Sequence, residues 1–236
     1  MIWLRSLLYS VVVWVVTPIF SVISILTFPL PPVTRYLIIS GWARSMIWWL
    51  DVTCGVSYRI VGAENIPKTP CIILAKHQSM WETMAFQCIF PPQVWVMKRE
   101  LLWVPFFGWG LAMTSPIAIN RKAGRDALIQ LVEQGKDRLA KGFWVVIFPE
   151  GTRIAPGKKG KYHIGGAWLA THTGAPALPV AHNAGEFWGK RQFLKKPGTI
   201  IVSIGKPIDT SGMKADELNK RVEAWIEGEM PHLASR

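Results

Sequence analysis

The stretch of sequence that decides the fold is Cys71-Ile72-Ile73-Leu74-Ala75-Lys76-His77-Gln78-Ser79-Met80-Trp81-Glu82. Residues 71–75 are a short apolar run typical of a buried strand, and residues 80–90 have the pattern of a helix. His77 therefore follows the end of a strand, and the carboxylate of Glu82 comes five residues later. This order pairs a possible base with an acid that can orient it, so the stretch predicts a strand–helix unit that carries a candidate reactive site.

Both residues also have a purely structural interpretation. A single histidine is more often structural than catalytic. Ser79 and Glu82 match the S-x-x-E capping box, in which the glutamate bonds a backbone amide at the helix start. Ser79 is interpreted as the N-cap rather than as a nucleophile, because residues two apart in a turn rarely face each other. The residues alone leave Glu82 as either a cap or the acid that orients His77.

Further apolar runs predict strands on both sides of this stretch. We expect strands near residues 56–60, 94–97, 117–119, 143–148, 177–181 and 199–204, and helices near 124–141, 164–173 and the C-terminal end. Alternation of strands and helices predicts an α/β fold with a mixed, largely parallel sheet flanked by helices. We predict two parts, a membrane-associated two-helix segment at 1–55 and an α/β domain at 56–236.

The N-terminal part has the composition of a membrane segment. Residues 7–30 contain no charged side chain, and as a helix they can cross a hydrocarbon core of ~30 Å. A cleaved secretory signal is the competing interpretation, but residues 28–32 make a poor cleavage site. Residues 33–51 predict a second helix with a narrow polar stripe that suits the membrane interface. Two arrangements stay open: a spanning helix followed by an interfacial one, or a helical hairpin in a single leaflet.

Charge and composition narrow the classes of partner. The formal net charge is +12, which indicates an anionic partner such as a phosphate-bearing substrate, anionic membrane lipids or nucleic acid. Nucleic acid is disfavoured because the tryptophans lie mainly among aliphatic residues and the chain starts with a membrane segment. The three cysteines form no CxxC pair, so we expect neither a metal site nor a disulfide framework. More basic residues follow the first apolar segment than precede it, where Arg5 is the basic residue. This difference predicts that the α/β domain faces the cytoplasm.

A second candidate site follows the apolar run at 143–148. Glu150-Gly151-Thr152-Arg153 offers a flexible glycine, a hydroxyl and a guanidinium, which together suit a phosphate. An ordinary turn with a solvated arginine is the alternative. Lys98 and Arg121 also follow predicted strands, so they either converge on the same anion or are surface charges.

The motifs at His77–Glu82 and at 148–153, and their order along the chain, resemble those of the glycerolipid acyltransferase family. The resemblance is greatest to its bacterial 1-acyl-sn-glycerol-3-phosphate acyltransferases. His77 and Glu82 match the family's His-x4-Asp motif with glutamate in the acid position. Its Phe-Pro-Glu-Gly-Thr-Arg motif is complete at 148–153, and Ala177-Leu178-Pro179-Val180 is similar to its fourth block. The second block, Lys-x-Glu-Leu-x3-Pro-x2-Gly, is matched by Lys98, Glu100, Leu101, Pro105 and Gly108.

The resemblance implies an enzyme of phospholipid biosynthesis in the bacterial inner membrane. It would transfer an acyl group from acyl-CoA or acyl-ACP (acyl carrier protein) to the sn-2 hydroxyl of lysophosphatidic acid, giving phosphatidic acid, with no further cofactor. His77 would act as general base and Glu82 would hold its imidazole. The resemblance implies that acceptor-binding residues are Lys98, Arg121, Glu150, Gly151, Thr152 and Arg153, the cations on the phosphate and Glu150 on glycerol oxygens or Arg153.

Two departures from the family pattern leave the acceptor open. Glutamate stands in place of aspartate at Glu82, and Asn120 replaces the acid that usually precedes Arg121. Lyso-ornithine lipid and other lysophospholipids are therefore alternative acceptors. A non-catalytic lipid-binding relative is a further alternative, and a serine hydrolase is disfavoured because no G-x-S-x-G motif is present.

Overall fold

A seven-stranded sheet forms the centre of the chain in the computed structural model, which describes residues 1–120 and 123–234. The spatial order of the strands is β1-β7-β6-β2-β5-β3-β4. In chain order they are β1 (Val56–Val61), β2 (Ile72–Ala75), β3 (Gln93–Lys98), β4 (Ile117–Ile119), β5 (Trp144–Ile147), β6 (Ala177–His182) and β7 (Gly198–Ile204). Neighbours are parallel except β6 and β7, which are antiparallel. The predicted mixed, largely parallel sheet is confirmed.

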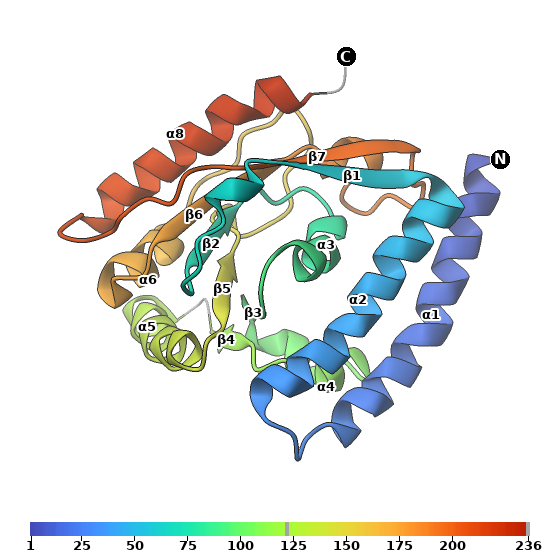
Figure 1. Cartoon of the computed structure of the whole chain (residues 1–236), viewed down its shortest axis with the longest axis horizontal. Helices are drawn as coiled ribbons and strands as arrows, with labels where there is room; N and C mark the ends of the chain where they lie inside the picture. The colour runs from blue at the N-terminus through green and yellow to red at the C-terminus, as the bar shows by residue number, and fades with distance from the viewer. Residues whose placement is uncertain (121–122, 235–236) are drawn as a thin grey trace.

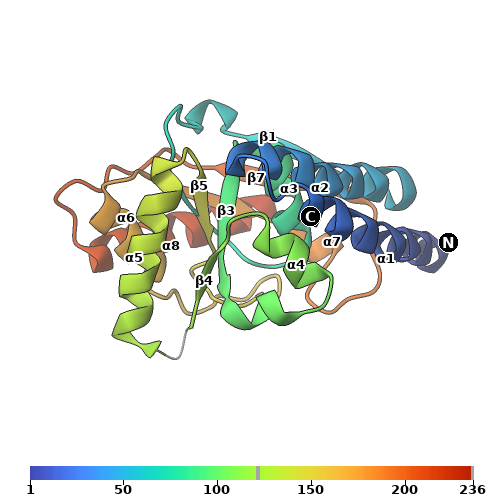
Figure 2. The same ribbon diagram turned by 90° about the horizontal axis from the view of Figure 1, so that it is seen from below.

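Helices cover both faces of the sheet (Figure 1 and Figure 2). One face carries α5 (Arg125–Ala140), α6 (Gly165–Thr173) and α8 (Ala215–Leu233). The other carries α3 (Trp81–Ile89), with α2 (Pro32–Cys54) and α1 (Ile2–Leu26) outside it. The sequence had not predicted three short elements, η1 (Ala63–Asn65), η2 (Arg99–Trp103) and α7 (Ala184–Phe187). A further short helix, α4 (Phe107–Ala112), follows η2.

The central strands explain why the sequence predicted them well. Every residue of β2, β5 and β6 is buried, because helices cover both faces. Both sets of side chains are therefore apolar, except His182 at the end of β6. Along β5, Val146 packs into the core beside α3 while Val145 packs into the core beside α5 and α8. β2 lies between β5 and β6 and is parallel to both, so the carboxyl ends of these three strands meet at one edge.

α1 and α2 form a helical pair along one flank of the domain (Figure 1). α1 is long and apolar enough to cross a membrane by its length and composition. α2 ends at Gly55, which has a left-handed φ of 67° and turns the chain into β1. The two expected helices are present, and α1 begins earlier than expected, at Ile2, with Arg5 exposed in its first turns. The division into two parts at residue 55 stays a prediction.

Candidate active site

His77 lies in the loop that joins β2 to α3, at the edge where β2, β5 and β6 end. Its Nδ1 lies 2.8 Å from Oε1 of Glu82, and its ring stacks on Phe148, with the ring centroids 3.9 Å apart. Because Nδ1 faces a carboxylate, it carries the ring proton and Nε2 keeps a lone pair. Within the described ranges no residue bonds Nε2, and 18% of the side chain is exposed. The imidazole is therefore oriented to accept a proton at Nε2.

The Glu82 carboxylate makes both of the interactions that the sequence left as alternatives, the helix cap and the contact with His77. Besides His77, its Oε1 accepts the backbone N–H groups of Gln78 and Ser79, each at 2.8 Å, and Oε2 accepts the N–H of Ser79 at 3.1 Å. The Ser79 hydroxyl accepts the N–H of Trp81 at 3.1 Å, as an N-cap does. The capping box and the contact with His77 therefore share one carboxylate, and the longer glutamate reaches Nδ1 without difficulty.

Glu82 remains ionised although it is fully buried. Burial raises the pKa of its carboxyl, but the hydrogen bonds from His77 and from the N–H of Ser79 outweigh burial and hold the pKa below its ordinary value. An ionised carboxylate beside Nδ1 stabilises the imidazolium that forms when Nε2 takes up a proton.

His182, at the end of β6, supports the same loop from behind. It is fully buried, and its Nε2 lies 2.9 Å from the carbonyl oxygen of Lys76 and 4.0 Å from Oε1 of Glu82. Its Nδ1 accepts the N–H of Ala184 at 3.3 Å, so Nε2 carries the proton and donates it to the carbonyl. Burial lowers the pKa of His182 and keeps the ring neutral. With both nitrogens engaged in hydrogen bonds to the backbone, this ring positions the backbone and does not transfer protons.

The turn after β5 lies beside His77, because the N–H of Ile154 donates to the carbonyl of His77 at 2.8 Å. Gly151 has φ 64°, a conformation that glycine adopts without strain. Thr152 is exposed, and its hydroxyl accepts a hydrogen bond from Lys190 at 3.1 Å. Arg153 is half-buried, and its guanidinium meets no acceptor among residues 1–120 and 123–234. This arginine is therefore available to an anion next to the histidine.

The other residues that were predicted to bind the acyl acceptor lie in different environments. Glu150 is buried, and its carboxylate bonds Lys76 and backbone N–H groups rather than Arg153. Lys98 ends β3 and is exposed at the same edge of the sheet. Arg121 lies outside the described residues.

Three residues near the site were missed by sequence reasoning: Lys76, His182 and Glu227. His182 could have been found, because it follows a predicted strand whose carboxyl end belongs at the same edge as His77. Lys76 is inside the deciding stretch, but a lysine is almost never expected to be fully buried. Glu227 lies on α8 and no local pattern links it to the site.

Comparison with known proteins assigns the chain to a family. A family model described as Acyltransferase matches residues 57–183, more than half of the chain. A 1-acyl-sn-glycerol-3-phosphate acyltransferase from Pseudomonas aeruginosa is 44% identical over 236 residues, covering 98% of this chain and 92% of the relative. The chain belongs to this acyltransferase family. The resemblance predicted from the motifs is confirmed.

Two more distant relatives agree. A 1-acyl-sn-glycerol-3-phosphate acyltransferase from Saccharomyces cerevisiae is 32% identical over 193 residues, and the alignment covers 77% of this acyltransferase and 61% of the yeast protein. The crystal structure of the 1-acyl-sn-glycerophosphate acyltransferase PlsC from Thermotoga maritima superposes with a TM-score of 0.80 at 24% identity, covering 99% of this chain and 96% of that one. The whole fold, including α1 and α2, is thus shared with that structure.

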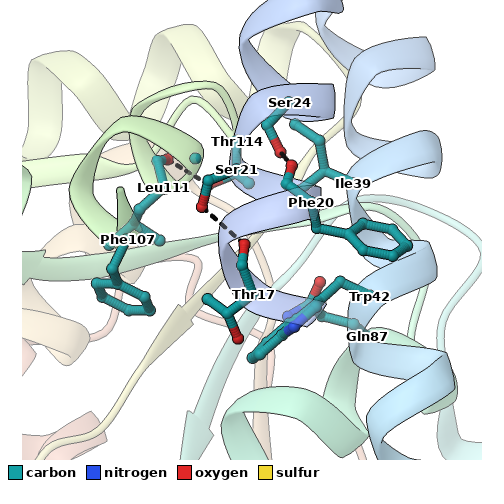
Figure 3. Close-up of a pocket in the computed structure, with 11 residues that line it drawn as sticks. Thr17, Phe20, Ser21, Ser24, Ile39, Trp42, Gln87, Phe107, Leu111 and Thr114 are labelled. Carbon is teal, nitrogen blue, oxygen red and sulfur yellow. Dashed lines mark hydrogen bonds between the residues drawn. The ribbon is translucent and has the colours of Figure 1, made fainter. Parts of the chain in front are cut away.

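An apolar pocket of about 90 Å³ lies between α1, α2 and α4 of the acyltransferase (Figure 3). Phe20 and Trp42 form part of its wall, and Gln87 of α3 borders it. The Ser21 and Ser24 hydroxyls in the wall donate to carbonyls one turn earlier in α1, at 3.0 Å and 2.6 Å. Their hydrogen-bonding needs are therefore met within the helix.

We expect Glu82→Gln to lower the acyl-transfer rate about 10²-fold or more, because a neutral amide does not stabilise the imidazolium. The amide also turns an N–H toward the backbone donors of Gln78 or Ser79, so the free energy of unfolding should fall by about 1–3 kcal/mol. Steady-state acyl transfer and unfolding in detergent measure the two effects. Thr83→Ala, one residue later in α3, is the matched control and should alter neither.

His77→Ala should abolish transfer while the protein stays folded, because the two backbone amides still bond Glu82. Nearly normal turnover of Glu82→Gln with a large loss of stability would show that Glu82 is only a helix cap.

Proposed function

We propose that this acyltransferase transfers a fatty acyl group from an acyl thioester to the sn-2 hydroxyl of lysophosphatidic acid and so forms phosphatidic acid. The observation that carries the proposal is the His77–Glu82 pair, oriented with Nε2 open, in a chain 44% identical over 98% of its length to a 1-acyl-sn-glycerol-3-phosphate acyltransferase. A non-catalytic lipid-binding role explains the helix cap at Glu82 but gives no chemical reason to keep both His77 and Arg153.

The geometry supports direct transfer without an acyl-enzyme intermediate. Nε2 of His77 takes the proton of the acceptor hydroxyl as its oxygen attacks the thioester carbonyl. An O–C bond forms and the C–S bond breaks, and the proton then passes from Nε2 to the leaving thiolate. Glu82 stabilises the imidazolium between these steps. General base catalysis of this kind supplies roughly 10² to 10⁴ in rate, and positioning of the two substrates supplies more.

The substrates offer negative charge to a basic protein. Arg153 is the best-placed cation for the acceptor phosphate, since it lies beside His77 and meets no acceptor in the described part of the chain. Lys98 lies at the same edge, and Arg121 is proposed for the same role from the motif alone. The donor is acyl-CoA or acyl-ACP. Both are anionic, so the charge of the protein does not select between them.

The decisive experiment uses purified full-length protein with a labelled acyl thioester and a panel of acceptors. We expect product with lysophosphatidic acid, and little with lysophosphatidylcholine or lyso-ornithine lipid. Preference for lyso-ornithine lipid or for another lysophospholipid would replace the proposed acceptor. Absence of transfer to every acceptor, with lipid binding retained, would identify a non-catalytic relative.

Arg153→Ala should raise the KM for lysophosphatidic acid about tenfold or more, because a hydrogen bond to a charged group contributes about 1.5–3 kcal/mol. The kcat should change less. Arg221→Ala, which removes an exposed arginine paired with Glu217 on α8, is the matched control. An unchanged KM for the phosphate-bearing acceptor would remove Arg153 from the phosphate site.

We also propose that α1 lies along the membrane plane, with the catalytic domain on the cytoplasmic side of the inner membrane. The first turns of α1 are attached to the loop at 188–197. Lys195 donates from its backbone N–H to the Ser6 hydroxyl and from Nζ to the Ser10 hydroxyl, both at 3.0 Å. Its Nζ also lies 5.1 Å from the ring centroid of Tyr9 and 5.0 Å from that of Trp188.

The far end of α1 is attached as well. It packs on α4, where a Cβ added at Gly110 would be in ordinary van der Waals contact with the Ser21 hydroxyl oxygen, at 3.4 Å. A helix of 25 residues is roughly 37 Å long at 1.5 Å per residue, and contacts at both ends keep that whole length against one domain. This supports the single-leaflet arrangement. The side of α1 away from the domain exposes Trp3, Leu4, Leu8, Val11, Trp14, Val15, Ile19 and Val22.

Protease-cleavable tags placed before Met1 and after Arg236 test this arrangement in sealed membrane vesicles. We expect protease to cleave both tags from the cytoplasmic side only, because neither end of α1 crosses the bilayer. Cleavage of the two tags from opposite sides would establish a spanning α1.

A further inference from the structure

We propose that Lys76, Glu150 and Glu227 form a buried ion cluster that positions the catalytic histidine, and that Glu150 acts through His77 rather than on the acceptor. Nothing in the family motifs assigns a role to Lys76 or Glu227. The inference rests on the proposed function of His77 as general base.

The first argument concerns the peptide group between residues 76 and 77. On one side of this group, the carbonyl of Lys76 accepts the Nε2–H of His182 at 2.9 Å. On the other side, the N–H of His77 donates to Oε2 of Glu150 at 3.0 Å. Both polar atoms of the peptide are engaged, so its plane has a fixed orientation.

The peptide group on the other side of His77 is fixed in the same way. Its carbonyl, that of His77, accepts the N–H of Ile154 at 2.8 Å, and its N–H, that of Gln78, donates to Glu82 at 2.8 Å. The two planes that flank the Cα of His77 determine its φ and ψ, and Glu82 with Phe148 then sets the ring. Glu150 supplies one of the four backbone contacts that hold the base.

The position of Glu150 depends in turn on a buried cation. Nζ of Lys76 lies 2.7 Å from Oε1 of Glu150 and 2.8 Å from Oε1 of Glu227, and the exposed fractions of these three side chains are 1%, 0% and 20%. A charge removed from water requires charged partners and hydrogen bonds in good geometry. Lys76 therefore holds Glu150 where it meets the N–H of His77, and Glu227 balances the cation from the other side.

Both carboxylate oxygens of Glu150 already accept hydrogen bonds from the protein, so they are not available to the acyl acceptor. Oε1 accepts from Lys76 at 2.7 Å and from the N–H of Gly160 at 3.3 Å, and Oε2 accepts from His77. With three donors and no exposed side-chain surface, the carboxylate has no free face toward a substrate. An acceptor-binding role for Glu150 would require this arrangement to open.

A substitution at Glu227 changes the ion cluster without changing any residue at the proposed substrate site. It lies on α8, which is on the opposite face of the sheet from α3 (Figure 1), and its Oε1 also accepts the hydroxyl hydrogen of Tyr162 at 2.7 Å. Glu223 lies one turn earlier on the same helix, and its carboxylate pairs at 2.6 Å with Lys159, whose side chain is 58% exposed. The two glutamates differ in whether their lysine is buried beside His77.

The test compares Glu227→Gln with Glu223→Gln in acyl transfer to lysophosphatidic acid, with unfolding measured in parallel. We expect Glu227→Gln to lower kcat about tenfold while the acceptor KM stays within about twofold, because the change displaces the base without touching the acceptor. Glu223→Gln should leave both values unchanged. Equal kcat values for the two variants would overturn the proposal, as would a loss of stability by Glu227→Gln without any loss of kcat.

Glu150→Gln separates positioning from acceptor binding. A positioning role predicts a kcat lowered by about 10-fold or more with a nearly unchanged acceptor KM, whereas acceptor binding predicts a raised KM at nearly constant kcat. The second result would overturn the proposal while leaving the proposed function intact. Failure of the wild-type protein to acylate lysophosphatidic acid would instead refute the proposed function.

Discussion

A carboxylate without access to water must be surrounded by donors, and the site of this acyltransferase is built around that requirement. Glu82 meets it with the imidazole of His77 and two consecutive backbone amides. The start of α3, the loop after β2 and the orientation of the base are therefore a single hydrogen-bonded unit. A helix cap and a catalytic orienter are usually separate functions of separate residues. Here the capping box keeps the carboxylate in place so that it can orient the histidine.

Much of the fold could be predicted because its central strands are buried on both faces. The apolar runs at β2 and β5 have no exposed side to vary, so local composition identifies them. The antiparallel pairing of β6 with β7 could not be predicted, because it depends on which sheet position β7 occupies rather than on its own residues. The boundaries of α1 were missed at its start because one exposed arginine near a helix end costs little.

The residues of the candidate site also divide into those that the sequence could identify and those that it could not. His77, Glu82 and the turn at 150–153 are contiguous motifs, so sequence alone identified them. Lys76 and Glu227 depend on a contact between residues 151 positions apart, and such a contact leaves no local pattern. Glu150 was expected at the acceptor, and in the fold it is buried and pairs with Lys76, another contact between distant residues. Composition predicts that a buried charge has a partner but does not say which residue it is.

The loop at 188–197 connects the candidate site to α1, since Lys190 bonds Thr152 in the turn at 150–153 and Lys195 bonds two serines of α1. Tyr9 of α1 is 1% exposed and belongs to the same apolar core as Leu50 and Val146. α1 is therefore not a detachable anchor. Trimming it to obtain a water-soluble enzyme would uncover the core beneath it and unpair the loop beside the turn at 150–153. Removal of this apolar helix would therefore also remove part of the core of the α/β domain.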